Sequence, residues 1–121
     1  MTQELILERK AQDEKNTARL LYFAHGVTFV FTLGLLSIIP VIINYMKRPD
    51  AEGTIAYSHH SWMIRSFWWY VVWIAIGWAV LILTLGIGFF IAWPIWGIAW
   101  LWKAYRLVKG LIDLDANKAM P

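Results

Sequence analysis

The sequence predicts an all-α fold, a polytopic helical membrane protein built from two helical hairpins. The run from Ser66 to Trp102 contains no Asp, Glu, Lys, Arg or His. A spanning helix needs about 20 apolar residues, so this run is too long for one such helix and long enough for two. The composition points the same way, because only 16% of the residues are charged, against about 25% in an average soluble chain.

The two predicted hairpins differ in length. We expect a full transmembrane hairpin over about residues 62–109 and a short or re-entrant hairpin over about residues 20–46. Residues 1–19 carry four acidic and four basic side chains and are predicted to form a soluble N-terminal helix. Residues 20–121 then form a single helical membrane domain with a short cytoplasmic C-terminal tail.

The segment 20–46 fits two geometries. It can be a single tilted helix that crosses once and is kinked at Pro40. Alternatively, the chain breaks at Thr32–Gly34 into two short helices, Leu20–Phe31 and Leu35–Met46, which enter and leave on one side.

His25 and Asn44 distinguish the two geometries. In the doubled-back form they lie at a similar depth on facing helices, so their side chains can hydrogen-bond. In a straight helix they are about 28 Å apart. A hydrogen bond between them therefore indicates the doubled-back form.

The positions of the cations also favour the doubled-back form. Of the 11 Lys and Arg residues, four precede Leu20, three lie between Lys47 and Arg65, and four follow from Lys103 onward. If residues 20–46 double back, all of these cations face one compartment, as the positive-inside rule favours. We therefore expect a multi-pass protein of the bacterial cytoplasmic (inner) membrane, with both termini cytoplasmic.

A polar connector, residues 47–54, separates the hairpins. Ser58 or Ser61 is the predicted N-cap of the next helix, because a serine oxygen accepts from the unpaired N–H groups of a first turn. Arg65 is predicted to anchor this helix by extending its side chain to the lipid headgroups.

The middle of the charge-free run predicts the reversal of the second hairpin. Thr84–Gly88 holds two glycines within three residues, and glycine tolerates a chain reversal most cheaply. The arms are then Ser66–Leu83 and Ile87–Ala104. Pro94 is expected to kink the second arm, and Gly110 is a predicted helix stop.

Small and aromatic residues predict how the arms of this hairpin pack. Small side chains permit a close approach of the arms at Ala75, Gly77, Ala79 and Gly97. Tryptophans recur near helical spacing at Trp62, Trp69 and Trp73 and at Trp93, Trp96 and Trp100. These stripes indicate helix packing and lipid contact rather than a cofactor pocket.

The lipid bilayer is the predicted partner of the basic side chains. The net charge is +3, but the cations lie beside apolar segments rather than along one soluble face, which argues against nucleic acid. Anionic headgroups are the expected counter-charge. The predicted headgroup anchors are Lys47, Arg48, Lys103, Arg106 and Lys109.

Few residues offer chemistry. The chain has no cysteine, which excludes disulfides, thiolate metal sites and a cysteine nucleophile, and it shows no catalytic motif. We therefore predict no enzyme activity, no catalytic residue, no cofactor and no metal site. His59 and His60 with Asp50 and Glu52 make only a weak metal pattern, because adjacent histidines on a helix point about 100° apart.

The structural or functional candidates are His25, Asn44, Pro40, His59 and Arg65. His25 is the one ionisable residue within an apolar run. We interpret it as a neutral, hydrogen-bonded structural group, with a haem ligand or a proton relay as the alternative reading.

Several short motifs follow one another along the chain: Phe23-Ala24-His25-Gly26, Ile39-Pro40-Val41-Ile42-Ile43-Asn44-Tyr45, Lys47-Arg48-Pro49-Asp50, Ser58-His59, Trp62-Met63-Ile64-Arg65-Ser66-Phe67-Trp68 and Tyr105-Arg106-Leu107-Val108-Lys109-Gly110. In this order they resemble the bacterial DUF4870 family, which is related to Tic20-like membrane proteins. The resemblance implies a compact helical membrane protein, with family-like positions at His25, Pro40, His59, Arg65, Arg106 and Gly110. By analogy with Tic20 it implies a part in protein translocation or in the assembly of membrane complexes.

The predicted function is that of a scaffold or accessory subunit that packs against other membrane proteins or against copies of itself. An oligomeric transporter or channel is the first alternative, and its path could be lined by Thr28, Thr32, Ser37, Asn44 and His25. A haem-binding redox subunit is the second alternative.

Overall fold

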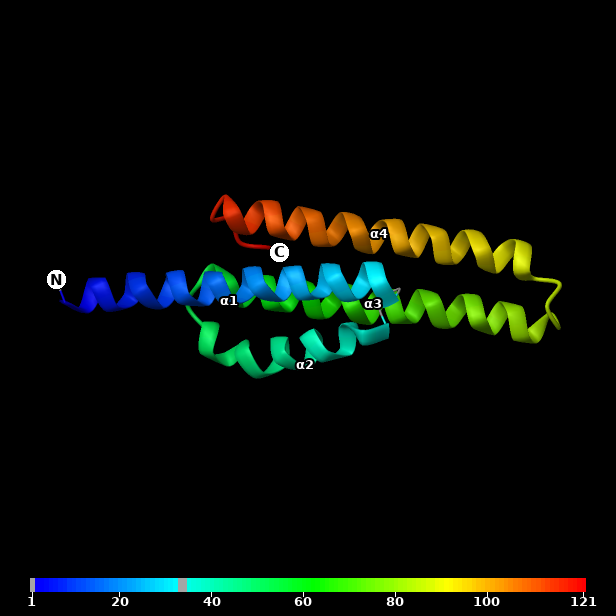
Figure 1. The fold of residues 1–121 in the computed structure, drawn as a ribbon, viewed down its shortest axis with the longest axis horizontal. Helices are drawn as coiled ribbons and strands as arrows, with labels where there is room; N and C mark the ends of the chain where they lie inside the picture. Colours follow the sequence, from blue (N-terminus) through cyan, green and yellow to red (C-terminus); the bar gives the residue numbers. More distant parts are fainter. Residues whose placement is uncertain (1, 33–34) are drawn as a thin grey trace.

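The computed structural model describes residues 2–32 and 35–121, and these residues are all-α (Figure 1). The helices are α1 (Thr2–Thr32), α2 (Ile38–Lys47), α3 (Ile55–Leu83) and α4 (Phe89–Asp115). Two short 3-10 helices, η1 (Leu35–Ser37) and η2 (Pro49–Ala51), precede and follow α2. The predicted all-α class is therefore confirmed.

The helices form two hairpins, α1 with α2 and α3 with α4 (Figure 1). The α1–α2 hairpin lies along the first half of α3 and the second half of α4, while the remaining halves of α3 and α4 extend beyond it as a two-helix arm. The doubled-back path of residues 20–46 is thus confirmed, and the single straight helix is wrong. The predicted break falls on residues 33–34, which lie outside the described residues.

α1 joins two segments that the sequence analysis treats separately. It runs without interruption from Thr2 to Thr32, so the predicted soluble N-terminal helix and the first arm of the short hairpin are one helix. Residues 3–13 are exposed and extend past the other helices, whereas Ala18, Leu21 and Tyr22 are buried against them.

Pro40 lies in the first turn of α2 rather than at a kink. The first N–H groups of a helix have no partner within the helix, so a proline at this point removes no hydrogen bond. Pro40 is buried. It marks the start of the second arm of the short hairpin.

Two predicted helix boundaries are wrong. α3 begins at Ile55 with Thr54 at its N-cap position, ahead of Ser58 and Ser61. α4 continues through Gly110 to Asp115. A Cβ atom at Gly110 would lie 2.2 Å from the hydroxyl oxygen of Tyr22, so this glycine permits α1 to approach α4 instead of ending the helix.

The α3–α4 arm is held by a close contact between Gly77 and Trp96. The indole Nε1 of Trp96 donates a hydrogen bond of 3.1 Å to the backbone oxygen of Ile74, and a Cβ atom at Gly77 would lie 2.1 Å from that nitrogen. Gly97 has nothing within 4 Å of such an atom. Of these two predicted close-approach positions, the structure therefore assigns the role to Gly77.

Among the described residues, α3 is the one helix that is long and apolar enough to cross a membrane. Only 22% of its most apolar 18-residue window is buried. The core helix of a soluble protein would be mostly buried. α3 instead presents most of its apolar surface outward.

The Gly77 contact predicts different effects of adding the same methyl group at two glycines. Gly77→Ala should lower the free energy of unfolding by about 1–3 kcal/mol, because the new methyl overlaps the Trp96 indole. Gly97→Ala should be neutral or stabilising, because alanine favours a helix and meets no neighbour. Urea unfolding of both variants in detergent micelles measures this, and equal effects at the two sites would contradict the packing.

Candidate functional site: a buried polar core

Three polar side chains from three helices are hydrogen-bonded in series inside the protein. The Nε2 atom of His25 on α1 lies 2.8 Å from Oδ1 of Asn44 on α2. The side-chain nitrogen of Asn44 lies 2.8 Å from Nδ1 of His60 on α3. All three residues are fully buried. The hydrogen bond that indicates the doubled-back geometry is present.

The direction of these hydrogen bonds determines the state of the imidazoles. The Asn44 oxygen can only accept, so His25 donates from Nε2. The Asn44 nitrogen can only donate, so His60 accepts at Nδ1 and is the neutral Nε2–H tautomer. The remaining nitrogens, Nδ1 of His25 and Nε2 of His60, are buried without a hydrogen-bond partner in the described part of the chain.

A second polar contact closes the deep end of the short hairpin. The hydroxyl oxygens of Thr28 on α1 and Ser37 in η1 lie 2.8 Å apart. The hydroxyl of Thr32 donates to the backbone oxygen of Thr28 and accepts from the backbone N–H of Leu36 at 3.1 Å. Each polar side chain predicted for a channel path therefore has at least one hydrogen-bond partner within the same chain.

His59 joins α1, α3 and the C-terminal segment at the other end of the bundle. Its Nε2 donates to the backbone oxygen of Lys118 at 2.7 Å. Because that bond places the ring proton on Nε2, the hydroxyl of Tyr22 donates to Nδ1, also at 2.7 Å. Both nitrogens of His59 are thus occupied.

The residues after α4 are held on the same face of α3. The backbone N–H of Met120 donates to the Ser58 hydroxyl at 2.9 Å, and the guanidinium of Arg65 donates to the backbone oxygen of Pro121. Arg65 itself is exposed. The predicted anchor therefore also fastens the C-terminal segment.

The structure does not assemble the weak metal pattern around His59 and His60. The two imidazoles are buried and bonded to different partners, whereas Asp50 and Glu52 are exposed in the connector. No group of three or more His, Asp or Glu side chains within residues 2–32 and 35–121 is placed to hold a metal ion.

Lys103 corrects the prediction of a headgroup anchor. Its side chain is 0% exposed, because this position of α4 faces α1 and α3. Its Nζ atom has no hydrogen-bond partner in the described ranges and lies 5.4 Å, 5.3 Å and 4.8 Å from the ring centroids of Phe29, Phe67 and Tyr70. Cation–π contact with three rings replaces contact with lipid phosphate.

Arg106 is half-buried and fixed between α3 and α4. Its Nε donates to the hydroxyl of Ser66 at 2.6 Å. Its guanidinium carbon lies 3.6 Å from the ring centroid of Trp62 and 4.9 Å from that of Trp102. The sequence analysis assigned Arg106 to the headgroups, whereas the structure gives it a packing role between the helices.

The remaining predicted anchors lie nearer the surface. Lys47 is exposed and Arg48 is partly exposed, with the guanidinium of Arg48 5.7 Å and 5.8 Å from the rings of Tyr45 and Tyr57. Lys109 forms an ion pair of 3.1 Å with Asp113 one turn along α4. These three cations can reach a lipid surface beside the connector and the end of α4.

An apolar groove of about 370 Å³ lies outside this core, between α1 and α4. Gly26 forms part of it, and a Cβ atom there would meet nothing within 4 Å. Such a groove suits an acyl chain or an apolar helix rather than a polar substrate.

Of the three residues in the buried hydrogen-bonded series, His25 and Asn44 could be found from the sequence, whereas His60 was missed. Asn44 and His25 stand out as polar residues in an apolar run. His60 was considered only with His59, although the two rings face different helices. The aromatic residues around Lys103 come from two helices, with Phe29 on α1 and Phe67 and Tyr70 on α3, and no local pattern connects them to Lys103.

No family model matches the chain, and neither the curated proteins nor the solved structures include one that matches it significantly.

The two hydrogen bonds of Asn44 predict a large effect of its replacement on stability. Asn44→Ala should lower the free energy of unfolding by about 2 kcal/mol or more, because it leaves two buried imidazoles without partners. Asn16 is exposed on α1, and Asn16→Ala should change stability by about 0.5 kcal/mol at most. Urea titration in micelles compares them, and similar losses would show that the Asn44 bonds are not important for stability.

Replacement of the buried Lys103 is predicted to raise stability rather than lower it. Lys103→Met keeps the length of the side chain and removes a buried charge, so it should stabilise the protein by about 1 kcal/mol or more. Lys109→Met should cost less than about 1 kcal/mol, since it removes a partly exposed ion pair. Unfolding curves give both values, and a clear loss of stability in Lys103→Met would mean that the ammonium is a net stabilising group.

Proposed function

We propose that this chain is a small integral membrane protein that acts without catalysis, as a scaffold or accessory subunit packing against other membrane helices. The short hairpin enters the bilayer part-way and returns, and the α3–α4 hairpin reaches farther across it. Both termini lie on the cytoplasmic side.

The proposal rests on where the side chains lie: several polar side chains are inside the protein, and many large apolar side chains are on its surface. The interior holds His25, Asn44, His60 and Lys103, each 0% exposed. The surface carries large apolar residues on every helix. Examples are Leu20, Phe31, Met46, Ile82, Phe90 and Leu101, each more than 60% exposed. Water disfavours so many adjacent apolar side chains, whereas hydrocarbon accommodates them.

α4 shows this distribution from Phe90 to Asp113, whereas Asp115 at its end is exposed. Its outward residues are 57–86% exposed and apolar or aromatic: Phe90, Ile98, Leu101, Tyr105, Val108 and Ile112. Its charged side chains at 103, 106, 109 and 113 are buried or half-buried. The outward apolar face from Phe89 to Ile112 is about 34 Å long at the helical rise, which is close to the thickness of a bilayer core.

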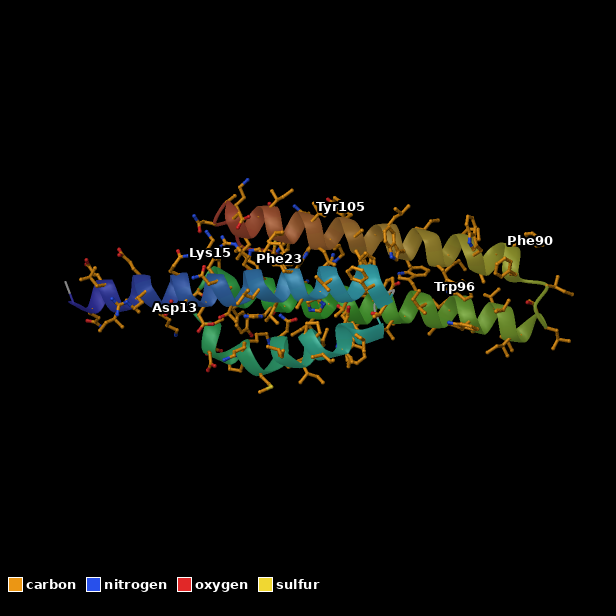
Figure 2. The ribbon with its side chains drawn as sticks, in the orientation of Figure 1. Asp13, Lys15, Phe23, Phe90, Trp96 and Tyr105 are labelled. Carbon is orange, nitrogen blue, oxygen red and sulfur yellow. The ribbon has the colours of Figure 1, made fainter. Side chains whose placement is uncertain are left out.

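The charges support the proposed orientation. Asp13 and Lys15 lie near one end of the molecule and Phe90 at the other (Figure 2). The α3–α4 turn has no ionisable residue for more than ten positions on either side. One polar end and one apolar end are what a protein inserted from a single side requires.

The core favours a structural role over the two alternative functions. Thr28 and Ser37 bond to each other, and Asn44 bonds to two histidines, so these groups are not left to line a path between copies. His25, for which a haem ligand was the alternative reading, is 0% exposed and donates from Nε2 to Asn44, which supports a structural role. The resemblance to the DUF4870 family adds, by analogy alone, a part in protein translocation or in membrane-complex assembly.

Membrane insertion and topology are tested together. The chain should stay in the membrane fraction after alkaline carbonate extraction. The chain has no native cysteine, so Thr2→Cys and Lys118→Cys each carry a single thiol. Both should react with a membrane-impermeant maleimide in inverted vesicles and not in intact spheroplasts. Recovery in the soluble fraction would overturn the membrane assignment, and labelling on opposite sides would overturn the topology.

The scaffold role is tested by purification of the tagged full chain in a mild detergent. We expect defined membrane proteins, or further copies of the chain, to co-elute in a fixed ratio. A protein that elutes as a colourless monomer would contradict the scaffold role, and a Soret band would favour the redox subunit.

A further inference from the structure

The reversal between α3 and α4 is the most apolar end of the molecule. Leu83, Leu85, Ile87 and Phe90 are 81–93% exposed there. A loop in water normally carries polar or charged residues at such positions. Here no Asp, Glu, Lys, Arg or His occurs from Ser66 to Trp102.

Five backbone N–H groups of this turn donate to backbone oxygens of the turn or of the last turn of α3. The N–H groups of Thr84, Leu85 and Gly86 donate to the oxygens of Val80, Ile82 and Leu81 at 3.1 Å, 3.1 Å and 2.9 Å. Those of Ile87 and Phe89 donate to Thr84 and Gly86 at 3.1 Å and 3.3 Å. Water would satisfy an open turn without such pairing, whereas hydrocarbon offers no partner and requires it.

Thr84 supplies the one polar side chain of the turn, and its hydroxyl both donates and accepts a hydrogen bond. Its hydroxyl donates to the backbone oxygen of Val80 at 2.7 Å and accepts from the backbone N–H of Gly88, also at 2.7 Å. The side chain therefore presents no free donor to its surroundings.

Leu85 occupies a position that would suit glycine better. It follows the helix cap with φ of +54°, a left-handed conformation that favours residues without a Cβ atom. Its side chain is 93% exposed. An apolar side chain on a strained backbone, projecting from the tip, is suited to contact with other apolar groups.

The length of the arm places the tip within the bilayer. From Ser66 to Leu83 the helix measures about 27 Å, and the outward face of α4 measures about 34 Å. A bilayer with its headgroups is about 40–45 Å thick. An arm that starts at the cytoplasmic interface therefore ends before the far aqueous phase.

We infer that residues 83–90 stay in the far leaflet, where Leu85, Ile87 and Phe90 contact lipid acyl chains, and that the hairpin has no aqueous loop on the far side. The inference rests on the proposed membrane insertion and adds to it. The partner of the tip is the lipid itself.

The experiment compares thiols at the tip and at the cytoplasmic end of the full chain. Leu85→Cys should resist an impermeant maleimide in spheroplasts and in inverted vesicles, and should react fully after detergent is added. Lys118→Cys is the matched control and should react in inverted vesicles. Ile87→Cys repeats the test should the variant at position 85 fold poorly.

A spin label at the same positions gives a second readout in vesicles of phosphatidylglycerol and phosphatidylethanolamine. At position 85 the collision rate with oxygen should exceed that with a water-soluble nickel chelate at least several-fold, and at position 118 the order should reverse. Labelling of Leu85→Cys from the outer face, with nickel access, would overturn the inference. Recovery of the whole protein in the soluble fraction would instead overturn the membrane assignment.

Discussion

The rest of the structure depends on the hydrogen bonds of Asn44, which pair buried polar groups of three helices inside the bundle. The exterior of the helices is apolar, so a polar group that turned outward would meet hydrocarbon in the proposed setting. Asn44 lies between His25 and His60, with contacts of 2.8 Å on each side. These bonds hold α1, α2 and α3 in one register.

The same constraint explains how the protein accommodates its inward cations. Lys103 lies among three aromatic rings, and Arg106 lies against Trp62 and Trp102 and donates to Ser66. Aromatic faces offer negative potential without introducing a second charge. The aromatic residues therefore pack in the interior of the four-helix part of the protein as well as covering the exposed surface of the α3–α4 arm.

Much of the fold could be predicted from local sequence patterns, and the wrong predictions for Gly110 and Lys103 have a common cause. Hydropathy located the two hairpins and the reversal at residues 84–88, and the distribution of Lys and Arg favoured the doubled-back path that the structure adopts. Gly110 and Lys103 were misjudged because their usual roles, helix stop and headgroup anchor, assume that nothing packs beside them. Tyr22 approaches Gly110, and three aromatic rings surround Lys103.

By itself, the sequence determined the helical class and the reversal at residues 84–88, because both follow from hydropathy and spacing. It also identified His25 and Asn44 as a pair that would hydrogen-bond if residues 20–46 doubled back. Tertiary structure alone decided that His60 hydrogen-bonds to Asn44, that Tyr22 hydrogen-bonds to His59 and that Lys103 points inward. Those contacts join helices far apart in sequence, and the rotation of each helix about its axis is set by packing against its neighbours.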